Sequence, residues 1–301
     1  MKTMKVSSWK KDLPLILMLL PAMIVVAIYC YGPMLGIVMA FEKFSPAKGF
    51  FKSPWVGMDN FKNLFTMPNI GQVIYNTVFI SVWKMILGIV VPVVFALLLN
   101  EISNKHAKRT FQTMVYLPHF LSWVILAGIF SDLLSRDGII NAALTSMGLE
   151  PVGFLSDQKA FPWTMIISDT WKGFGFGSII YLSALTSIDH NLYEAAQIDG
   201  ANRWQQTWHI TLPGIVSTII LMTVLSMGSI LNGGFDQIYN LYRPAVYETG
   251  DILDTFVFRL GINNAQFSLS TAAGLFKSAI SSILIIVSYF LADKLAGYQI
   301  F

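Results

Sequence analysis

Charge is the scarcest property of this sequence. Only 12% of its 301 residues are Asp, Glu, Lys or Arg, and 54% are hydrophobic. A water-soluble domain carries about 25% charged residues, so this chain has too few charges to cover a surface that faces water. Its mean hydropathy of +0.60 points the same way. The composition predicts a protein whose main solvent is lipid.

Residues for redox chemistry, metal binding and nucleic-acid contact are also scarce. The one cysteine, Cys30, excludes a disulfide within the chain. The four histidines have no Cys, Asp or Glu companions at ligand spacing, so we expect no metal site. The net charge of +3 is not gathered into a basic block, which argues against nucleic acid as a partner.

Catalytic patterns are missing as well. The sequence has no G-x-x-x-x-G-K-[ST] phosphate loop, the motif that cradles nucleotide phosphates in P-loop ATPases. Its apolar segments hold no Ser/His/Asp grouping, H-E-x-x-H motif or paired carboxylates. We therefore expect no catalytic residues, no ATPase activity in this chain and no directly bound cofactor.

Long apolar runs are what the sequence has in abundance. A helix needs about 20 mostly apolar residues to cross the roughly 30 Å hydrocarbon core of a membrane. The first run is too long for a cleaved signal peptide and lacks a cleavage site. We predict an all-α polytopic membrane protein with six transmembrane helices. They lie at about 13–40, 74–99, 111–134, 161–185, 212–233 and 271–292.

The placement of basic residues predicts the orientation of these spans. Four lysines (Lys2, Lys5, Lys10 and Lys11) precede the first span. If the N-terminus is cytoplasmic, basic residues are also denser in the inner segments than in the longer outer loops. Because six is an even number, the C-terminus returns to the cytoplasm. The segment between the fourth and fifth spans is then cytoplasmic.

That segment is unusually polar and is punctuated like a helix. Asn191 followed by Glu194 predicts a capping box, in which each side chain bonds the backbone of the other residue. Leu192, Ala195 and Ile198 recur at three-residue spacing and predict a short amphipathic face.

A sharp turn is expected directly after this face. Asp199-Gly200 should end the helix, because glycine suits the left-handed position at a helix C-terminus. A second short helix should run from about Asn202, and Pro213 opens the next span. The result is a helix–turn–helix elbow on the membrane surface. Its plainer alternative is an ordinary interfacial loop helix.

The spacing of the elbow resembles the EAA signature of ABC importer permeases. The matching residues are Glu194, Ala195, Ala196, Asp199, Gly200, Ala201, Ile210, Leu212 and Pro213. Residues 76–100 and 108–125 resemble the first two helices of that family's membrane core. LNGGFDQIYNLY, at 231–242, resembles sugar-importer permeases, particularly those that serve polysaccharide-degrading systems.

The resemblance implies a type I ABC importer (MetI-like) transmembrane fold with a cytoplasmic coupling helix. Residues 1–70 would hold the N-terminal tail, the first span and an external loop; 71–292 would form a permease core of five spans, and 293–301 a cytoplasmic tail. The elbow would be the coupling helix that contacts an ATPase. Its ATPase-coupling residues are Glu194, Ala195, Ala196, Asp199, Gly200, Ala201, Trp204 and Trp208.

Partners follow from the same resemblance. They are a second homologous permease subunit, two cytoplasmic ATPase subunits that bind ATP and Mg, and an extracellular solute-binding protein. The assembly would sit in lipid, in the inner or plasma membrane of a bacterial cell.

Polar groups in the fourth and fifth spans suggest where a substrate passes, because such groups are costly in lipid and usually face a cavity or a partner. Asp169 and Lys172 are three residues apart and are expected to pair. Gly173 and Gly177 form a G-x-x-x-G pattern that suits close helix packing.

By resemblance to maltose-type permeases, both spans contribute to a sugar site. Its substrate-pathway residues are Lys172, Gly173, Phe176, Ser226, Ser229, Asn232 and Gly233. Lys172 would suit an acidic sugar such as a uronate. The alternative is that the serines bond only their own helix and the glycines only pack. Further pathway candidates, which interfacial anchoring explains equally well, are Trp83, Lys84, Tyr116, His119 and Trp123.

By this resemblance, the chain is expected to be the permease subunit of an ATP-driven oligosaccharide importer. A permease for peptides or amino acids is the nearest alternative. A secondary transporter driven by an ion gradient would show inverted repeats and paired acids near the membrane midplane, and Asp169 is the single acid inside the predicted spans other than Asp132 near the end of the third.

Overall fold

The computed structural model describes residues 9–50 and 52–296. Apart from one isolated antiparallel bridge between Glu42 and Trp55, the regular structure in this part of the chain is helical. The labels η1–η6 denote short π-helical or 3-10-helical segments. In order the elements are α1 (Trp9–Val26), η1 (Ala27–Tyr31), η2 (Gly32–Phe41), α2 (Asp59–Thr66), α3 (Ile70–Asn100), α4 (Lys105–Tyr116), η3 (Leu117–Phe120), α5 (Trp123–Leu133), α6 (Ile139–Ser146), α7 (Ala160–Thr186), α8 (His190–Ile198), α9 (Arg203–Gln206), η4 (Thr207–Thr211), α10 (Leu212–Met227), α11 (Phe235–Leu241), η5 (Pro244–Val246), α12 (Tyr247–Gly250), α13 (Leu253–Phe258), η6 (Arg259–Asn263) and α14 (Phe267–Ala296).

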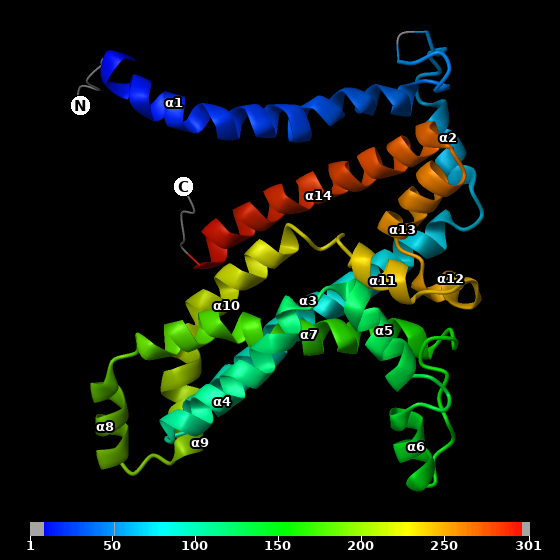
Figure 1. Cartoon of the computed structure of the whole chain (residues 1–301). Coiled ribbons are helices and arrows are strands. Elements are labelled where there is room, and N and C mark those ends of the chain that lie inside the picture. Colours follow the sequence, from blue (N-terminus) through cyan, green and yellow to red (C-terminus); the bar gives the residue numbers. More distant parts are fainter. Residues whose placement is uncertain (1–8, 51, 297–301) are drawn as a thin grey trace.

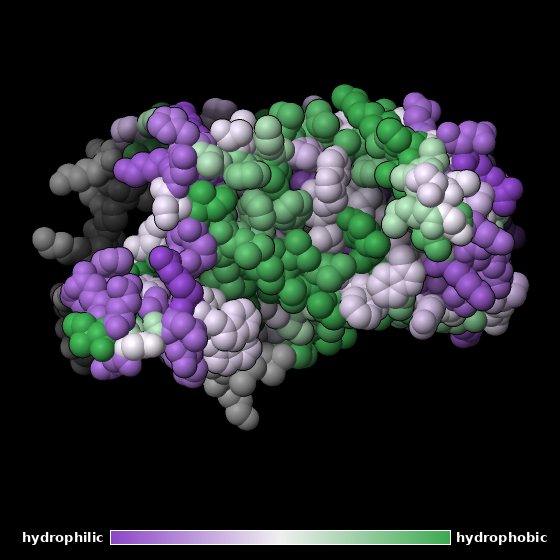
Figure 2. Space-filling view, turned by 90° about the horizontal axis from the view of Figure 1, so that it is seen from below, coloured by the Kyte–Doolittle hydropathy of each residue, from purple (hydrophilic) through white to green (hydrophobic). Residues whose placement is uncertain are grey.

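The apolar runs of the sequence became long helices. Among the described residues, four helices are long and apolar enough to cross a membrane, or five if one bent pair is a single span. α7 is also long, at 27 residues, and coincides with the predicted fourth span. It is not among the helices apolar enough to span, and it is the helix that carries Asp169 and Lys172. Figure 2 shows apolar residues over the middle of one face and polar residues at both ends.

The first run stands apart from the rest. α1, η1 and η2 continue one another, and the predicted first span falls in their Leu13–Phe41 stretch, of whose most apolar window no part is buried. Pro33 is the second residue of η2, a position where a proline without an N–H is tolerated. The run meets the remaining chain mainly through η2, which packs on α14 (Figure 1).

α3 and α7 form the centre of the fold. They pack on each other more extensively than any other pair of elements. Gly177 of α7 allows this approach, since a Cβ there would lie 3.3 Å from the ring of Pro92 on α3. Gly175 makes a still tighter contact with α4: a Cβ would lie 2.3 Å from the carbonyl oxygen of Val115. The residues that let these helices meet are therefore Gly175 and Gly177, whereas Gly173 faces open space.

Two predicted spans are broken rather than straight. The predicted span 111–134 bends by 104° between η3 and α5. Pro118 lies in η3, and Ser122 then caps α5 by accepting from the Ile125 amide at 3.3 Å. The predicted span 212–233 ends early, because α10 stops at Met227 and an irregular segment, 228–234, follows it. Both predictions of continuous helices were wrong, since hydropathy reports burial in lipid and not local backbone geometry.

The domain ends also differ in detail from expectation. α14 continues to Ala296, so the start of the predicted 293–301 tail is helical. Residues 297–301, and Lys2 and Lys5 of the predicted orientation signal, lie outside the described residues.

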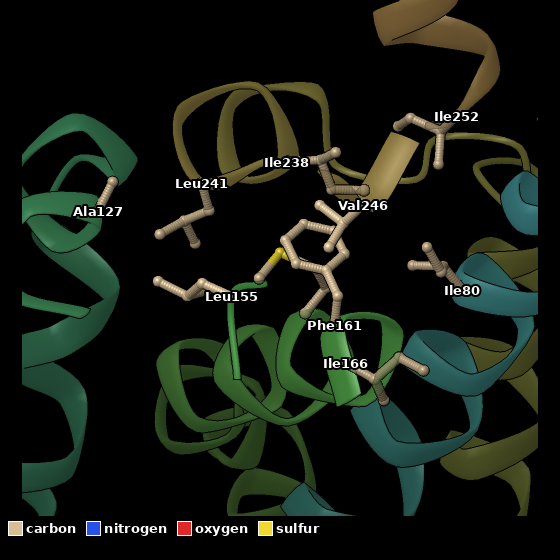
Figure 3. Packing of buried hydrophobic residues seen from close by; sticks show 10 residues of the cluster. Ile80, Ala127, Leu155, Phe161, Ile166, Ile238, Leu241, Val246 and Ile252 are labelled. Atoms are coloured by element: carbon tan, nitrogen blue, oxygen red, sulfur yellow. The ribbon is translucent and has the colours of Figure 1, made fainter. Parts of the chain in front are cut away.

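An apolar cluster fixes the short elements after α10 onto the central pair. Phe161 of α7 lies among Ile238 and Val246, with Ile80 of α3 on the far side of the cluster (Figure 3). Gly250 packs against the Phe161 ring, where a Cβ would be 2.4 Å from a ring carbon. This contact holds α12 against α7, and α11 packs on α7 as well. The irregular segment 228–234 lies beside α3, where Lys84 donates to Gly233 O.

Candidate coupling surface and substrate cavity

The elbow begins with a cap different from the predicted one. α8 starts at His190, and Asp189 is its N-cap, accepting a hydrogen bond from the Asn191 amide at 3.0 Å. The predicted Asn191–Glu194 capping box is wrong, because Asn191 already lies inside the first turn. The carboxylate of Asp189 also interacts favourably with the positive, N-terminal end of the helix dipole.

The turn after α8 is built as predicted. Gly200 has a φ of +80°, the left-handed conformation that favours glycine. Its amide donates to Gln197 O at 3.1 Å, and the Ala201 amide donates to Ala196 O at 2.8 Å. These two bonds form a Schellman motif, which satisfies the last free carbonyls of a helix. The prediction that Asp199-Gly200 ends the helix is confirmed.

The second arm has its own cap. Asn202 and Gln205 form a reciprocal capping box at the start of α9. Gln206 is buried and donates to Ala201 O at 2.9 Å, which ties the arm back to the turn. η4 and α10 continue from α9, so the elbow leads directly into a membrane helix.

Two contacts fasten the elbow to the ends of neighbouring helices. Arg203 Nη1 lies 2.8 Å from Glu101 Oε2, just beyond the end of α3. The hydroxyls of Tyr193 on α8 and Thr211 on η4 lie 2.9 Å apart and share a hydrogen bond. α8 is therefore linked to η4, and α9 to the end of α3.

The outer face of the elbow is apolar and uncovered. Ile198 is 87% exposed, and Leu192, Trp204 and Trp208 are exposed as well. The two tryptophan rings stack with centroids 6.2 Å apart. Glu194 and Ala195 are exposed, whereas Ala196 and Ala201 are half-buried toward the chain. α8 and α9 lie at the same end of the molecule as the first described residues of α1 and the last of α14 (Figure 1).

The second candidate site is a polar cavity at the break after α10. Its volume is about 220 Å³. Three of the predicted pathway residues line it, namely Ser226, Ser229 and Asn232. The other lining residues are Ser81, Lys84, Met85, Gly88, Asp169, Ile230 and Gly234. The cavity thus brings α3, α7 and segment 228–234 together around hydroxyl, amide and charged groups.

The serine hydroxyls also bond their own backbone. Ser226 Oγ donates to Met222 O at 2.7 Å, and Ser229 Oγ donates to Ser226 O at 3.0 Å. Each hydroxyl oxygen keeps lone pairs that can accept from a ligand. Gly233 does not line the cavity; its Cα packs on Ile252, where a Cβ would be 2.8 Å from the side chain.

The predicted pair of Asp169 and Lys172 does not form. Asp169 Oδ1 instead lies 3.9 Å from Lys84 Nζ of α3. Lys172 Nζ donates to His119 O at 3.2 Å and lies 5.4 Å from the centre of the Trp123 ring. Residues three apart on a helix are neighbours, but here each side chain finds a partner on a different helix.

Three other predicted pathway residues, Lys172, Gly173 and Phe176, lie on α7 outside the cavity. The Phe176 ring stacks on the imidazole of His119, with centroids 4.1 Å apart and planes within 4°. Lys172 and Phe176 thus both attach α7 to the bend between η3 and α5. Phe176 remains exposed, and Gly173 adjoins open space.

α3 contributes more to this site than its sequence indicates, because Lys84 is only a further pathway candidate by sequence and Ser81 is not a candidate. The buried Gln237 beside it is not among the predicted residues either. Ser81 and Lys84 are three residues apart within an apolar helix, and that spacing of polar residues in a span was the available signal. Gln237 gave no comparable signal, because its role depends on how α11 folds back onto α7.

Comparison with known proteins identifies the class of molecule. Residues 87–297 match the family described as binding-protein-dependent transport system inner membrane component. The chain belongs to this family. It is 41% identical to Protein LplB of Bacillus subtilis (strain 168), over 95% of this chain and 90% of that protein. It is also 41% identical to the polygalacturonan/rhamnogalacturonan transport system permease protein YteP of the same organism, over 93% and 88%.

Solved structures agree with this assignment. The fold superposes with a TM-score of 0.87 on a chain of a bacterial ABC transporter involved in the import of the acidic polysaccharide alginate, at 40% identity over 95% of this chain and 97% of that one. A second structure, of the alginate transporter with a periplasmic protein that holds an alginate pentasaccharide, gives 0.88 at 38% identity, over 97% and 98%. The chain is therefore an all-helical ABC importer permease with the MetI-like fold.

Proposed function

We propose that this chain is the membrane-spanning subunit of an ATP-driven importer that translocates an oligosaccharide derived from an acidic polysaccharide. The observation that carries the proposal is the cavity beside segment 228–234, where hydroxyl and amide groups converge with Lys84 and Asp169 in a largely apolar protein. Sugars are bound by such groups, and polar residues at this depth are costly unless they serve a pathway. The similarity to an alginate importer and to YteP supports a uronate-containing substrate.

Six spans are proposed to cross the membrane, with α7 as the fourth. Its charged side chains are engaged by α3 and η3, so they need not face lipid. The ends of α1 and α14 and the elbow share one end of the molecule, which we assign to the cytoplasm. The lysines before the first span favour that assignment.

The elbow is proposed to dock on a cytoplasmic ATPase. Its apolar outer face, with Ile198, Trp204 and Trp208, is the kind of exposed patch that marks a protein interface. Glu194 lies exposed on the same helix and is proposed to contact that partner. ATP and Mg would be bound by two copies of the ATPase.

Two further partners complete the proposed assembly. A second, homologous permease would stand opposite the α7 surface that carries Lys172, Gly173 and Phe176, and would close the pathway between the two chains. A solute-binding protein would deliver the substrate at the end that carries α2 and α12. The complex of the alginate transporter with its periplasmic protein supports this last assignment.

Reconstitution tests the proposal. The chain is purified with its companion permease and ATPase, placed in lipid vesicles and supplied with binding protein and labelled uronate oligosaccharide. We expect uptake that requires ATP, and no uptake when the chain is present by itself. Uptake by the chain alone, driven by an ion gradient, would overturn the proposal in favour of a secondary transporter.

A further inference from the structure

The cavity beside segment 228–234 is lined by charged groups. A site that recognises a neutral sugar only through its hydroxyl groups does not require them. Lys84 contributes its ammonium group, and its side chain is 9% exposed. Among the residues that line the cavity, Lys84 and Asp169 are the two charged ones. An ammonium group at this depth is costly, so it usually serves a specific partner.

Lys84 is held in place by neutral acceptors. Its Nζ donates to Gly233 O at 2.8 Å and to Oε1 of Gln237. Gln237 is fully buried, and its Nε2 donates to Met165 O and to Ser168 Oγ, each at 2.8 Å. The glutamine therefore fixes the ammonium relative to α7. Gly234 has a φ of +89°, and a Cβ there would lie 2.8 Å from Lys84 Nζ, so a glycine is needed beside the charge.

Asp169 carries the opposite charge but does not form a direct hydrogen bond with Lys84. Asp169 Oδ1 lies 3.9 Å from Nζ, whereas N–H···O hydrogen bonds span about 2.7–3.2 Å. The Asp169 side chain is 37% exposed, so its carboxylate is free to turn toward solvent. By contrast, Lys277 of α14 is in direct contact with Asp254 and also donates to Asn232. The charge of Lys84 is thus less completely neutralised by a neighbouring carboxylate than that of Lys277.

A second polar residue lies beside Lys84. Ser81 lies one turn before Lys84 on α3 and lines the cavity. The residue is 4% exposed, and its hydroxyl oxygen has no hydrogen-bond partner within the described chain. Buried polar atoms are nearly always paired. The Ser81 hydroxyl and the Lys84 ammonium group, three residues apart on one helix, are two donors that suit the two oxygens of one carboxylate.

We propose that Lys84, with Ser81, is the carboxylate-reading site for a uronate unit of the translocated oligosaccharide, and that the substrate carboxylate takes the place of Asp169 beside the ammonium. The inference rests on the proposed function and adds the residue that selects for charge. The volume of about 220 Å³ is below the roughly 300–1,000 Å³ of sites for whole ligands. The cavity therefore receives one sugar unit, and the rest of the chain extends outside it.

Lys172, the lysine that the sequence suggested for this role, is engaged elsewhere. It lies outside the cavity, bonded to His119 O and placed over the Trp123 ring. The two lysines therefore provide a comparison within the same transporter.

The test measures selectivity in the reconstituted complex. The probes are five-unit oligosaccharides from alginate and polygalacturonate, each paired with its carboxyl-reduced, neutral form. Lys84→Met keeps the side-chain length and removes the charge. We expect it to lower the ratio of acidic to neutral uptake by about tenfold, the size of a lost hydrogen bond to a charged group. Lys84→Arg should retain most of the preference, and Lys172→Gln should change it less than Lys84→Met does.

A variant of opposite sign covers the case in which Lys84→Met fails to fold. Asp169→Asn removes the competing carboxylate and should raise the ratio of acidic to neutral uptake. Ser81→Ala should lower it by a few fold. A lower ratio in Asp169→Asn, an unchanged ratio in folded Lys84→Met, or a larger effect from Lys172→Gln would overturn the inference alone. If the wild-type complex imports none of the probes, the proposed function fails instead.

Discussion

Single glycines decide how closely the helices of this permease approach one another. Gly175 and Gly173 lie on the same helix, two residues apart, yet their surroundings are opposite. A Cβ at Gly175 would lie 2.3 Å from Val115 O, and one at Gly173 would meet nothing within 4 Å. Backbone atoms cannot move aside as a flexible side chain does, so the two sites should respond differently to the same methyl group.

Gly175→Ala is therefore expected to destabilise the protein, by about 1–3 kcal/mol as for other overpacked sites. The cause is that α4 must move away from α7. The measurement is the thermal midpoint of this chain, purified in detergent without its partners. Gly173→Ala is the matched control and should leave the midpoint unchanged or slightly raised, because alanine favours helix. Equal midpoints for the two variants would contradict the packing described for α4 and α7.

At the same scale, the sequence showed where polar residues sit in the spans but not which ones pair. Asp169 and Lys172 satisfied the spacing rule for a pair on one helix. That rule says only that two side chains are neighbours, and a residue on another helix can be nearer. Asp169 interacts with Lys84 of α3, and Lys172 donates to the carbonyl oxygen of His119. A single sequence contains no information on that competition.

Among the elements, the elbow was the most predictable, because local chemistry determines it. The left-handed turn at Gly200 and the cap at Asn202 depend on residues within a few positions of each other. The bend between η3 and α5 and the early end of α10 were not predictable in the same way. Both predicted spans are mostly apolar, so their hydropathy does not mark where the helices break.

The elbow also yields a prediction of function. Gly200→Val should leave the protein inserted in the membrane but uncouple ATP hydrolysis from uptake. No atom lies within 4 Å of the added Cβ, so the effect comes from the left-handed backbone, which costs roughly 1–2 kcal/mol for a residue with a side chain. The ratio of transported substrate to hydrolysed ATP is the measurement.

Gly71→Val provides the control for that experiment. This glycine near the start of α3 also adjoins open space but has an ordinary backbone conformation. Normal coupling in both variants would remove the elbow's geometry from the mechanism.

On the scale of the whole molecule, the predicted topology can be tested with the one native cysteine removed. Cys30 is exposed, so Cys30→Ser gives a background without thiols. Gln197→Cys on α8 and Glu150→Cys after α6 then place single thiols at opposite ends of the fold. A membrane-impermeant reagent added to intact cells, with the outer membrane permeabilised where one is present, should label the cysteine at 150 and spare the one at 197. The reverse pattern would invert the orientation, and with it the assignment of the elbow to the ATPase side.

The uncovered surface of α1 has a consequence for the abundance of the subunit in the cell. The most apolar window of its span has no buried part, and the run is fastened to the rest of the chain mainly near η2. Such an arm gains a fixed place only from neighbours that assemble around it. A copy that is synthesised before its partner subunits should therefore be degraded by quality-control proteases. The relative rates of subunit synthesis, and not the stability of this chain by itself, would then set the number of transporters in a cell.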